Sequence, residues 1–167
     1  MVGIINYGAG NLRSLSNALT HLGIDWTITS DPKELQTCSH LILPGVGSFR
    51  FGMTQLHALG LYDYLKNTDQ PILGICLGMQ LLAEEGEEGG QTKGLGLLQG
   101  KVKKLKEPHV GWDYWGLQTY YFTHHYAIKD APWAIQQDRL WACQFHPEKS
   151  QQNGLNFLQQ WYASSQS

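Results

Sequence analysis

Residues 71–82 read PILGICLGMQLL, and this stretch decides the fold. The apolar run over residues 71–75 has the length and composition of a buried strand, and a helix is expected over residues 78–85. Cys76 lies between them on a Gly-x-Cys-x-Gly turn. A strand, a tight turn and a helix in this order form the repeating unit of a parallel sheet that is covered by helices.

The rest of the first half repeats this alternation. It predicts strands over residues 2–7, 26–29 and 40–43, and helices over residues 12–22, from Asp31-Pro32 onward and over residues 54–66. Short apolar strands that alternate with helices predict an α/β fold of three layers, with a mostly parallel central sheet and helices on both faces. The second half predicts strands over residues 101–106, 118–126 and 139–145, and a last helix over residues 154–162.

The composition of the chain limits which classes of function are possible. The 167 residues, 42% hydrophobic and 16% charged, predict one globular domain over residues 1–167. A net charge of −2 argues against binding to nucleic acid or to an anionic membrane surface. No apolar run approaches the roughly 18 residues of a membrane span. The three widely spaced cysteines fit neither a disulfide framework nor a zinc site, so we expect a cytoplasmic protein with reduced thiols.

Cys76 is a candidate nucleophile. Ligands of open parallel sheets bind at the carboxyl ends of the strands, where Cys76 is expected. Its turn matches the nucleophile-elbow pattern with Cys in place of Ser, and the start of the following helix favours a thiolate. The backbone N–H of Leu77 can stabilise an oxyanion. A small buried thiol at a strand end explains the local pattern about equally well.

Two further segments can complete a site at the same edge. His146 follows the predicted strand over residues 139–145, and Glu148 is placed to orient its imidazole ring. The segment PGVGSF over residues 44–49 offers backbone N–H groups, which suit a second oxyanion donor. Taken singly, these features are more typical of a surface histidine with a solvated glutamate and of an ordinary glycine-rich turn.

Seven segments resemble one family in the same order along the chain. They are IINYGAGNLRSL (4–15), LILPGVGSF (41–49), GICLGMQLLAEEGEEG (74–89), KGLGLLQGKV (93–102), PHVGW (108–112), YYFTHHY (120–126) and QFHPEKSQQNGLNFL (144–158). Together they resemble the class I (triad-type) glutamine amidotransferases, which have a flavodoxin-like fold. Within this class they resemble the glutaminase subunits of imidazole glycerol phosphate synthase, an enzyme of histidine biosynthesis.

The resemblance implies a mechanism. Cys76 attacks the side-chain amide of glutamine, His146 relays protons, and Glu148 orients His146. It also implies a set of residues that hold the oxyanion or the substrate, namely Gly45, Val46, Gly47, Leu77, Gln80, Thr123, His124 and His125. Ammonia then passes to a (β/α)₈-barrel cyclase, which forms imidazole glycerol phosphate and an aminoimidazole carboxamide ribotide.

The resemblance further implies a heterodimer, with Asn11, Trp112 and Tyr120 in stretches that border the cyclase. Core packing is the alternative for the two aromatic residues. We expect no cofactor, because the chain lacks a phosphate-binding or dinucleotide motif. We also expect no metal, because His124 and His125 are adjacent on a predicted strand and point to opposite sides.

The sequence departs from the family in its second half, which is shortened after Lys101. Asp113 stands where the family has Asn, and His125 where it has Ser. These departures leave three alternatives open: ammonia supply to another synthase, such as one that aminates a surface sugar, a non-catalytic module that binds a partner, and a cysteine hydrolase that acts alone.

Overall fold

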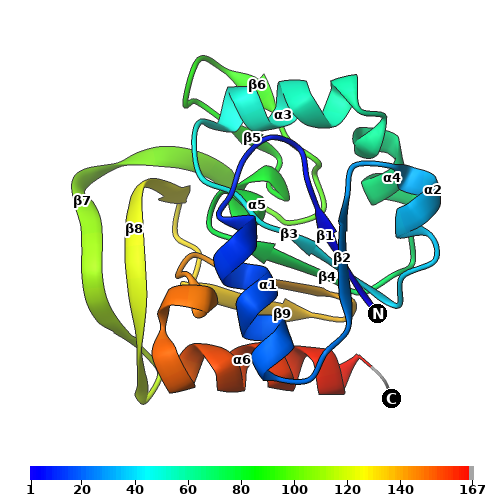
Figure 1. The fold of residues 1–167 in the computed structure, drawn as a ribbon. Coiled ribbons are helices and arrows are strands. Elements are labelled where there is room, and N and C mark those ends of the chain that lie inside the picture. The colour runs from blue at the N-terminus through cyan, green and yellow to red at the C-terminus, as the bar shows by residue number, and fades with distance from the viewer. Residues whose placement is uncertain (166–167) are drawn as a thin grey trace.

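The computed structural model describes residues 1–165, and its centre is a six-stranded sheet of order β2-β1-β3-β4-β10-β9 (Figure 1). The first five strands in this order are parallel, and β9 pairs antiparallel with β10 at one edge. Their bounds are β1 Val2–Ile5, β2 Trp26–Thr29, β3 His40–Leu43, β4 Ile72–Ile75, β9 Ala134–Gln137 and β10 Leu140–Cys143. The mostly parallel sheet confirms the prediction.

Helices cover both faces of this sheet. Side chains of α1 (Leu12–His21) and α6 (Gln151–Ser164) share one apolar cluster with one face of the strands. The other face packs against the remaining helices, which are α2 (Pro32–Leu35), α3 (Phe49–Ala58), α4 (Leu61–Asn67) and α5 (Leu77–Leu81). These three layers are those expected from the alternating pattern. Within residues 1–165, none of the helices is long and apolar enough to span a membrane.

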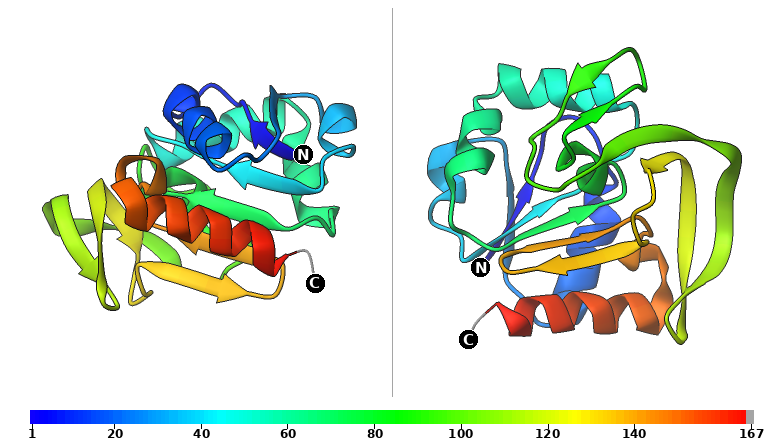
Figure 2. Two further views of the ribbon diagram at one scale, coloured as in Figure 1. Left: turned by 60° about the horizontal axis from the view of Figure 1, so that its bottom comes forward. Right: turned by 180° about the vertical axis from the view of Figure 1, so that it is seen from behind.

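The second half forms a separate four-stranded sheet of order β6-β5-β7-β8. The short strands β5 (Glu85–Gly86) and β6 (Thr92–Lys93) adjoin the start of a long antiparallel hairpin made of β7 (Lys101–Trp115) and β8 (Gln118–Ile128). We call this hairpin, residues 101–128, the ribbon. It stands at one end of the molecule in both views of Figure 2.

Several predicted boundaries are wrong. The helix expected over residues 54–66 is two helices, because Gly60 takes a left-handed conformation (φ +70°) that ends the first one. The helix expected over residues 78–85 ends at Leu81, and Glu85 already belongs to β5. The strand expected over residues 101–106 continues to Trp115, and β9 was not predicted.

Candidate active site

Cys76 lies directly after β4 in a backbone conformation that is rare for a side-chain-bearing residue, with φ +54° and ψ −109°. Such conformations cost about 1–3 kcal/mol and concentrate at functional sites. The flanking glycines make the turn possible. A Cβ on Gly78 would lie 1.7 Å from the carbonyl oxygen of Leu43, and one on Gly74 would lie 2.9 Å from the backbone nitrogen of Met79. The Gly-x-Cys-x-Gly spacing therefore has a steric cause.

His146 follows β10, the strand that neighbours β4. Its Nδ1 lies 2.7 Å from Oε1 of Glu148, which belongs to the short 3₁₀ turn Pro147–Lys149. Both side chains are almost fully buried, at 2% and 6% exposure. Burial lowers the pKa of His146, but its interactions with the Cys76 sulfur and the Glu148 carboxylate more than offset this and raise it to about 10. His146 is therefore protonated near neutral pH.

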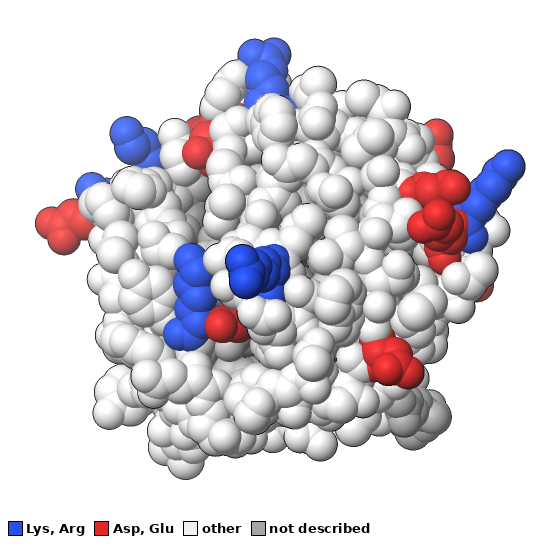
Figure 3. Space-filling view, viewed as in Figure 1, with Lys and Arg blue, Asp and Glu red and all other residues white. Residues whose placement is uncertain are grey.

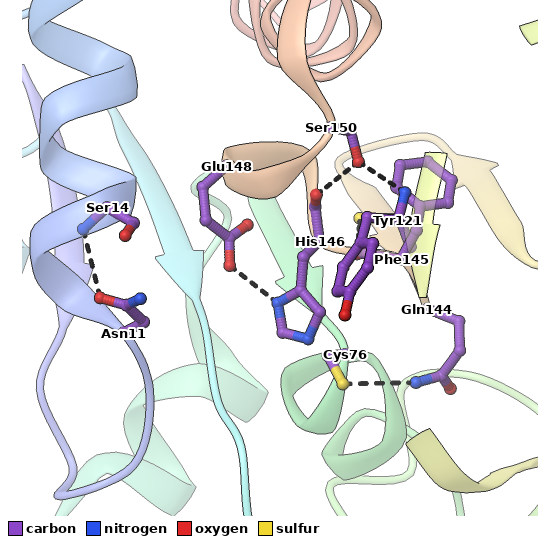
Figure 4. Close-up of polar contacts among 10 residues, drawn as sticks. Asn11, Ser14, Cys76, Tyr121, Gln144, Phe145, His146, Glu148 and Ser150 are labelled. Carbon is purple, nitrogen blue, oxygen red and sulfur yellow. Dashed lines mark hydrogen bonds and ion pairs between the residues drawn. The ribbon is translucent and has the colours of Figure 1, made fainter. Parts of the chain in front are cut away.

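The imidazole of His146 lies between Glu148 and Cys76 (Figure 4). Among residues 1–165, its Nε2 has no hydrogen-bond partner, so this nitrogen is free to exchange a proton at the sulfur side of the ring. The amide of Gln144, 3.5 Å from the sulfur, donates to Cys76. The three side chains of Cys76, His146 and Glu148, which we call the triad, thus lie in the order that a nucleophile, a base and an orienting carboxylate take in covalent catalysis.

The triad also contacts the ribbon. The backbone N–H of His146 donates to the carbonyl of Tyr121 at 2.9 Å, and the N–H of Tyr121 donates to Oγ of Ser150 at 2.9 Å. The Ser150 hydroxyl donates in turn to the carbonyl of His146 at 2.6 Å, as Figure 4 shows. The position of His146 therefore depends on β8 as well as on the central sheet.

The segment Pro44–Gly47 lies beside the elbow. The N–H of Leu77, the expected oxyanion donor, donates to the carbonyl of Gly45 at 3.2 Å. The buried hydroxyl of Tyr7 donates to the carbonyl of Pro44 and holds the segment on its other side. Because the Leu77 N–H already has a partner, Gly45 must move before this donor can bind an oxyanion.

A cavity of about 240 Å³ opens beside Cys76. It is lined by most of the residues that sequence analysis proposed for the substrate, namely Val46, Gly47, Leu77, Gln80, Thr123, His124 and His125. Gln80 is 3% exposed, and its amide donates to the carbonyl of Tyr126 at 2.9 Å and to Oε1 of Gln144 at 3.3 Å. His124 is buried and His125 is exposed, although both line the cavity.

Three further residues line the cavity that were not expected from the sequence, namely Ser48, Glu88 and Tyr126. Glu88 is the most informative of them. Burial raises the pKa of its carboxyl, while a backbone hydrogen bond from Phe49 and the nearby His125 lower it. The signal that could have found it is the acidic run after the elbow helix, since a carboxylate in a cavity suits a cationic group of a ligand.

The remaining residues predicted for substrate binding or for the partner interface lie outside the cavity. Gly45 contributes its carbonyl to Leu77 and is not among the cavity residues. Tyr120 is 8% exposed and stacks on Phe145 at 4.0 Å, so it packs in the core and offers little surface to a partner. Asn11 is exposed and caps α1 by accepting from the N–H of Ser14 at 3.3 Å. Trp112 is 49% exposed on the ribbon.

A parallel sheet between two layers of helices, with a cysteine elbow beside a His–Glu pair, defines a class of enzymes. Similarity to known proteins identifies that class. The family model "Glutamine amidotransferase class-I" matches residues 3–130, and the chain belongs to this family. Among solved structures, one titled "Crystal structure of glutamine amidotransferase" superposes with a TM-score of 0.77 at 20% identity, covering 99% of each chain. A glutamine amidotransferase from Thermotoga maritima gives 0.60 at 15% identity, covering 98% of this chain and 82% of that one. These two likenesses support the fold.

The curated relatives are more specific. The chain is 40% identical to "Imidazole glycerol phosphate synthase subunit HisH 1" of Campylobacter jejuni, over 95% of this chain and 98% of the relative. It is also 40% identical to the HisH subunit of Exiguobacterium sibiricum, over 96% and 94%. The first alignment runs over 196 residues, more than the 167 of this chain. That relative therefore has segments that this chain lacks, in agreement with the expected shortening.

Proposed function

We propose that this chain is the glutaminase subunit of an imidazole glycerol phosphate synthase of histidine biosynthesis. The observation that carries the proposal is the buried arrangement of Cys76, His146 and Glu148 beside a cavity in a chain that is 40% identical to HisH subunits. A partner-binding module would have no need for a strained cysteine next to a protonated histidine.

The proposed reaction proceeds in two steps. The Cys76 thiolate attacks the side-chain amide carbon of glutamine, and protonated His146 donates from Nε2 to the leaving nitrogen, which departs as ammonia. A γ-glutamyl thioester remains on Cys76. His146, now neutral, takes a proton from water, and the resulting attack releases glutamate and regenerates the thiolate. One glutamine and one water thereby give one glutamate and one ammonia.

Substrate binding follows from the cavity. The carboxylate of Glu88 offers a partner for the α-ammonium group of glutamine. Thr123 and the backbone of Val46 and Gly47 offer polar groups to its remaining atoms. The oxyanion of the tetrahedral intermediate requires the Leu77 N–H, which Gly45 occupies in this structure. We therefore expect low glutaminase activity until the Pro44–Gly47 segment rearranges, a step that a docked partner can favour.

The proposed partner is a (β/α)₈-barrel cyclase that receives the ammonia. Val46 and Trp112 are exposed large apolar side chains on the cavity wall and on the ribbon, at 45% and 49%. Charged side chains of both signs are scattered over the face seen in Figure 3, and neither sign forms an extended patch there. Amination of another acceptor by a different synthase is the alternative, because the triad would serve either partner equally.

Glutamate release from glutamine tests the proposal. The purified chain, with and without a histidine-pathway cyclase and its nucleotide, is compared with Cys76→Ala. We expect release that requires the cyclase and that falls by about 10⁴-fold or more in the variant. Release that requires Cys76 but ignores the cyclase would favour the alternative synthase. A folded complex without any release would reject the glutaminase function.

A further inference from the structure

A second line of ionisable side chains runs from the surface of the ribbon to the cavity. Nε2 of His109 lies 2.9 Å from a carboxylate oxygen of Asp113, and Nδ1 of His109 lies 2.9 Å from Nε2 of His124. Nδ1 of His124 lies 2.8 Å from the carbonyl of Tyr126. His109 and His124 are directly paired across β7 and β8, and His124 lines the cavity. The line thus joins the exposed strand to the cavity wall.

The hydrogen-bond partners of the two imidazole rings determine which ring nitrogens carry a proton. The Tyr126 carbonyl can only accept, so Nδ1 of His124 carries a proton. Burial lowers the pKa of His124 to about 4, aided by the charges of His109, His146 and His125 and opposed by the Tyr126 hydrogen bond. His124 is therefore neutral near pH 7, and its Nε2 accepts from His109. Since the Asp113 carboxylate also accepts only, both nitrogens of His109 must donate, which makes His109 a cation.

We propose that Asp113 holds His109 as an imidazolium, and that this cation fixes the ring of His124 as a wall of the glutamine cavity. The identity of the ligand, glutamine, rests on the proposed function, whereas the charge of His109 does not. Asp113 and His109 are positioning residues that act through His124.

The surroundings of His109 suit a cation. Its ring stacks on Phe122 at 4.2 Å and lies 4.9 Å from the ring of Trp133. Asp113 is the anionic group that contacts it, and His124 is the second ionisable group within hydrogen-bond distance. His125 and His146 act electrostatically on the far partner, His124.

The cation gives a donor to each of its two partners. A His109 ring with a single proton can donate to Asp113 or to His124 but not to both. In that case the ring of His124 loses its fixed partner, and glutamine binding weakens. Replacing Asp113 by asparagine removes the charge that stabilises the imidazolium.

The first test is ¹⁵N NMR of the histidine-labelled chain, with His109→Gln to assign the signals. We expect both His109 nitrogens of the wild type to be protonated at pH 7, and one to be bare in Asp113→Asn. The matched control is Asp130→Asn, the same change at an exposed turn residue whose φ of +61° asparagine tolerates. A neutral His109 in the wild type would overturn the proposal.

The second test is glutamine hydrolysis by the complex with the cyclase at pH 7. We expect Asp113→Asn to raise the KM for glutamine by about tenfold, with kcat changed less than twofold. Asp130→Asn should match the wild type. A wild-type KM in Asp113→Asn would reject the positioning role. A wild type without Cys76-dependent hydrolysis would reject the glutaminase function itself, while the NMR result would still decide the charge of His109.

Discussion

The strands of the central sheet and those of the ribbon differ in how far they are buried. β1, β3 and β4 are buried along their whole length, whereas most residues of β7 are partly or fully exposed. Exposed apolar side chains on the ribbon include Val110, Trp112 and Tyr114, at 59%, 49% and 66%. The central sheet buries its apolar side chains against other parts of the same chain. The ribbon leaves an apolar surface of the kind that marks a protein-binding site.

The active site lies where these two regions meet. Cys76 and His146 follow neighbouring strands of the sheet, and β8 of the ribbon supplies Thr123 and His124 to the cavity. A rigid sheet can hold the nucleophile in its strained conformation, while a ribbon held mainly by its own hairpin can respond to a partner. This difference between the two regions can be tested region by region.

The largest difference is expected from one substitution made in each region. Gly78→Ala places a Cβ 1.7 Å from the Leu43 carbonyl oxygen, and we expect it to lower the free energy of unfolding by about 3 kcal/mol or more. Gly116→Ala adds a Cβ at the ribbon turn, where it meets no atom of the described chain within 4 Å. Only the φ of +61° disfavours alanine there, so we expect the free energy of unfolding to fall by about 1 kcal/mol. Urea unfolding measures both. Equal losses would contradict the contrast.

A smaller difference is expected from the buried and surface ion pairs. The pKa of His146 is raised from 6.5 to about 10, so its contribution to stability is fully present below pH 6.5 and is lost as pH rises through 10. We expect Glu148→Gln to lower the free energy of unfolding by about 1.5–3 kcal/mol at pH 6, and by progressively less toward pH 10.

Glu87→Gln is the matched control on the ribbon side, because Glu87 pairs with Lys103 at the surface, 3.1 Å away. Its effect should be small at every pH, since exposed pairs contribute little. Urea unfolding at pH 6, 8 and 9.5 compares the two variants. A Glu148→Gln effect that stays constant over this range would show that the charge of His146 is not its cause.

The smallest effect on stability is expected at the exposed tryptophans. Trp112→Ala should leave the melting temperature nearly unchanged and weaken binding to the cyclase by about tenfold or more. Trp26→Ala is the control, since Trp26 is 37% exposed at the start of β2, away from the carboxyl edge that carries Cys76. Calorimetric titration measures both affinities. Equal affinities for the two variants would place the docking surface elsewhere than on the ribbon.

Much of the parallel half could be predicted because its signals are local. Short apolar runs between glycines and caps locate the strands, and the glycines around Cys76 report a turn that no larger residue can form. The helix break at Gly60 was missed because the apolar spacing on both sides of it continues without interruption. The edge strand β9 was missed because its ladder is defined by its partner β10.

The length of β7 could not be predicted from the sequence. Residues 101–115 contain Pro108 and Gly111, which argue against a long strand. The structure accommodates Pro108 within the irregular pairing between Lys104 and His109, where a missing N–H costs no ladder bond. Only the tertiary pairing with β8 reveals this.

The sequence by itself therefore determined the fold class, because short apolar runs between glycines and caps are local signals. It predicted Cys76, His146 and Glu148 as site residues through the order of motifs along the chain. The tertiary structure decided that the Leu77 N–H is occupied by Gly45, that Glu88 enters the cavity, that Tyr120 is core, and that Asp113 reaches His109. These contacts join groups from different turns and strands, and their geometry is set by how the two sheets meet.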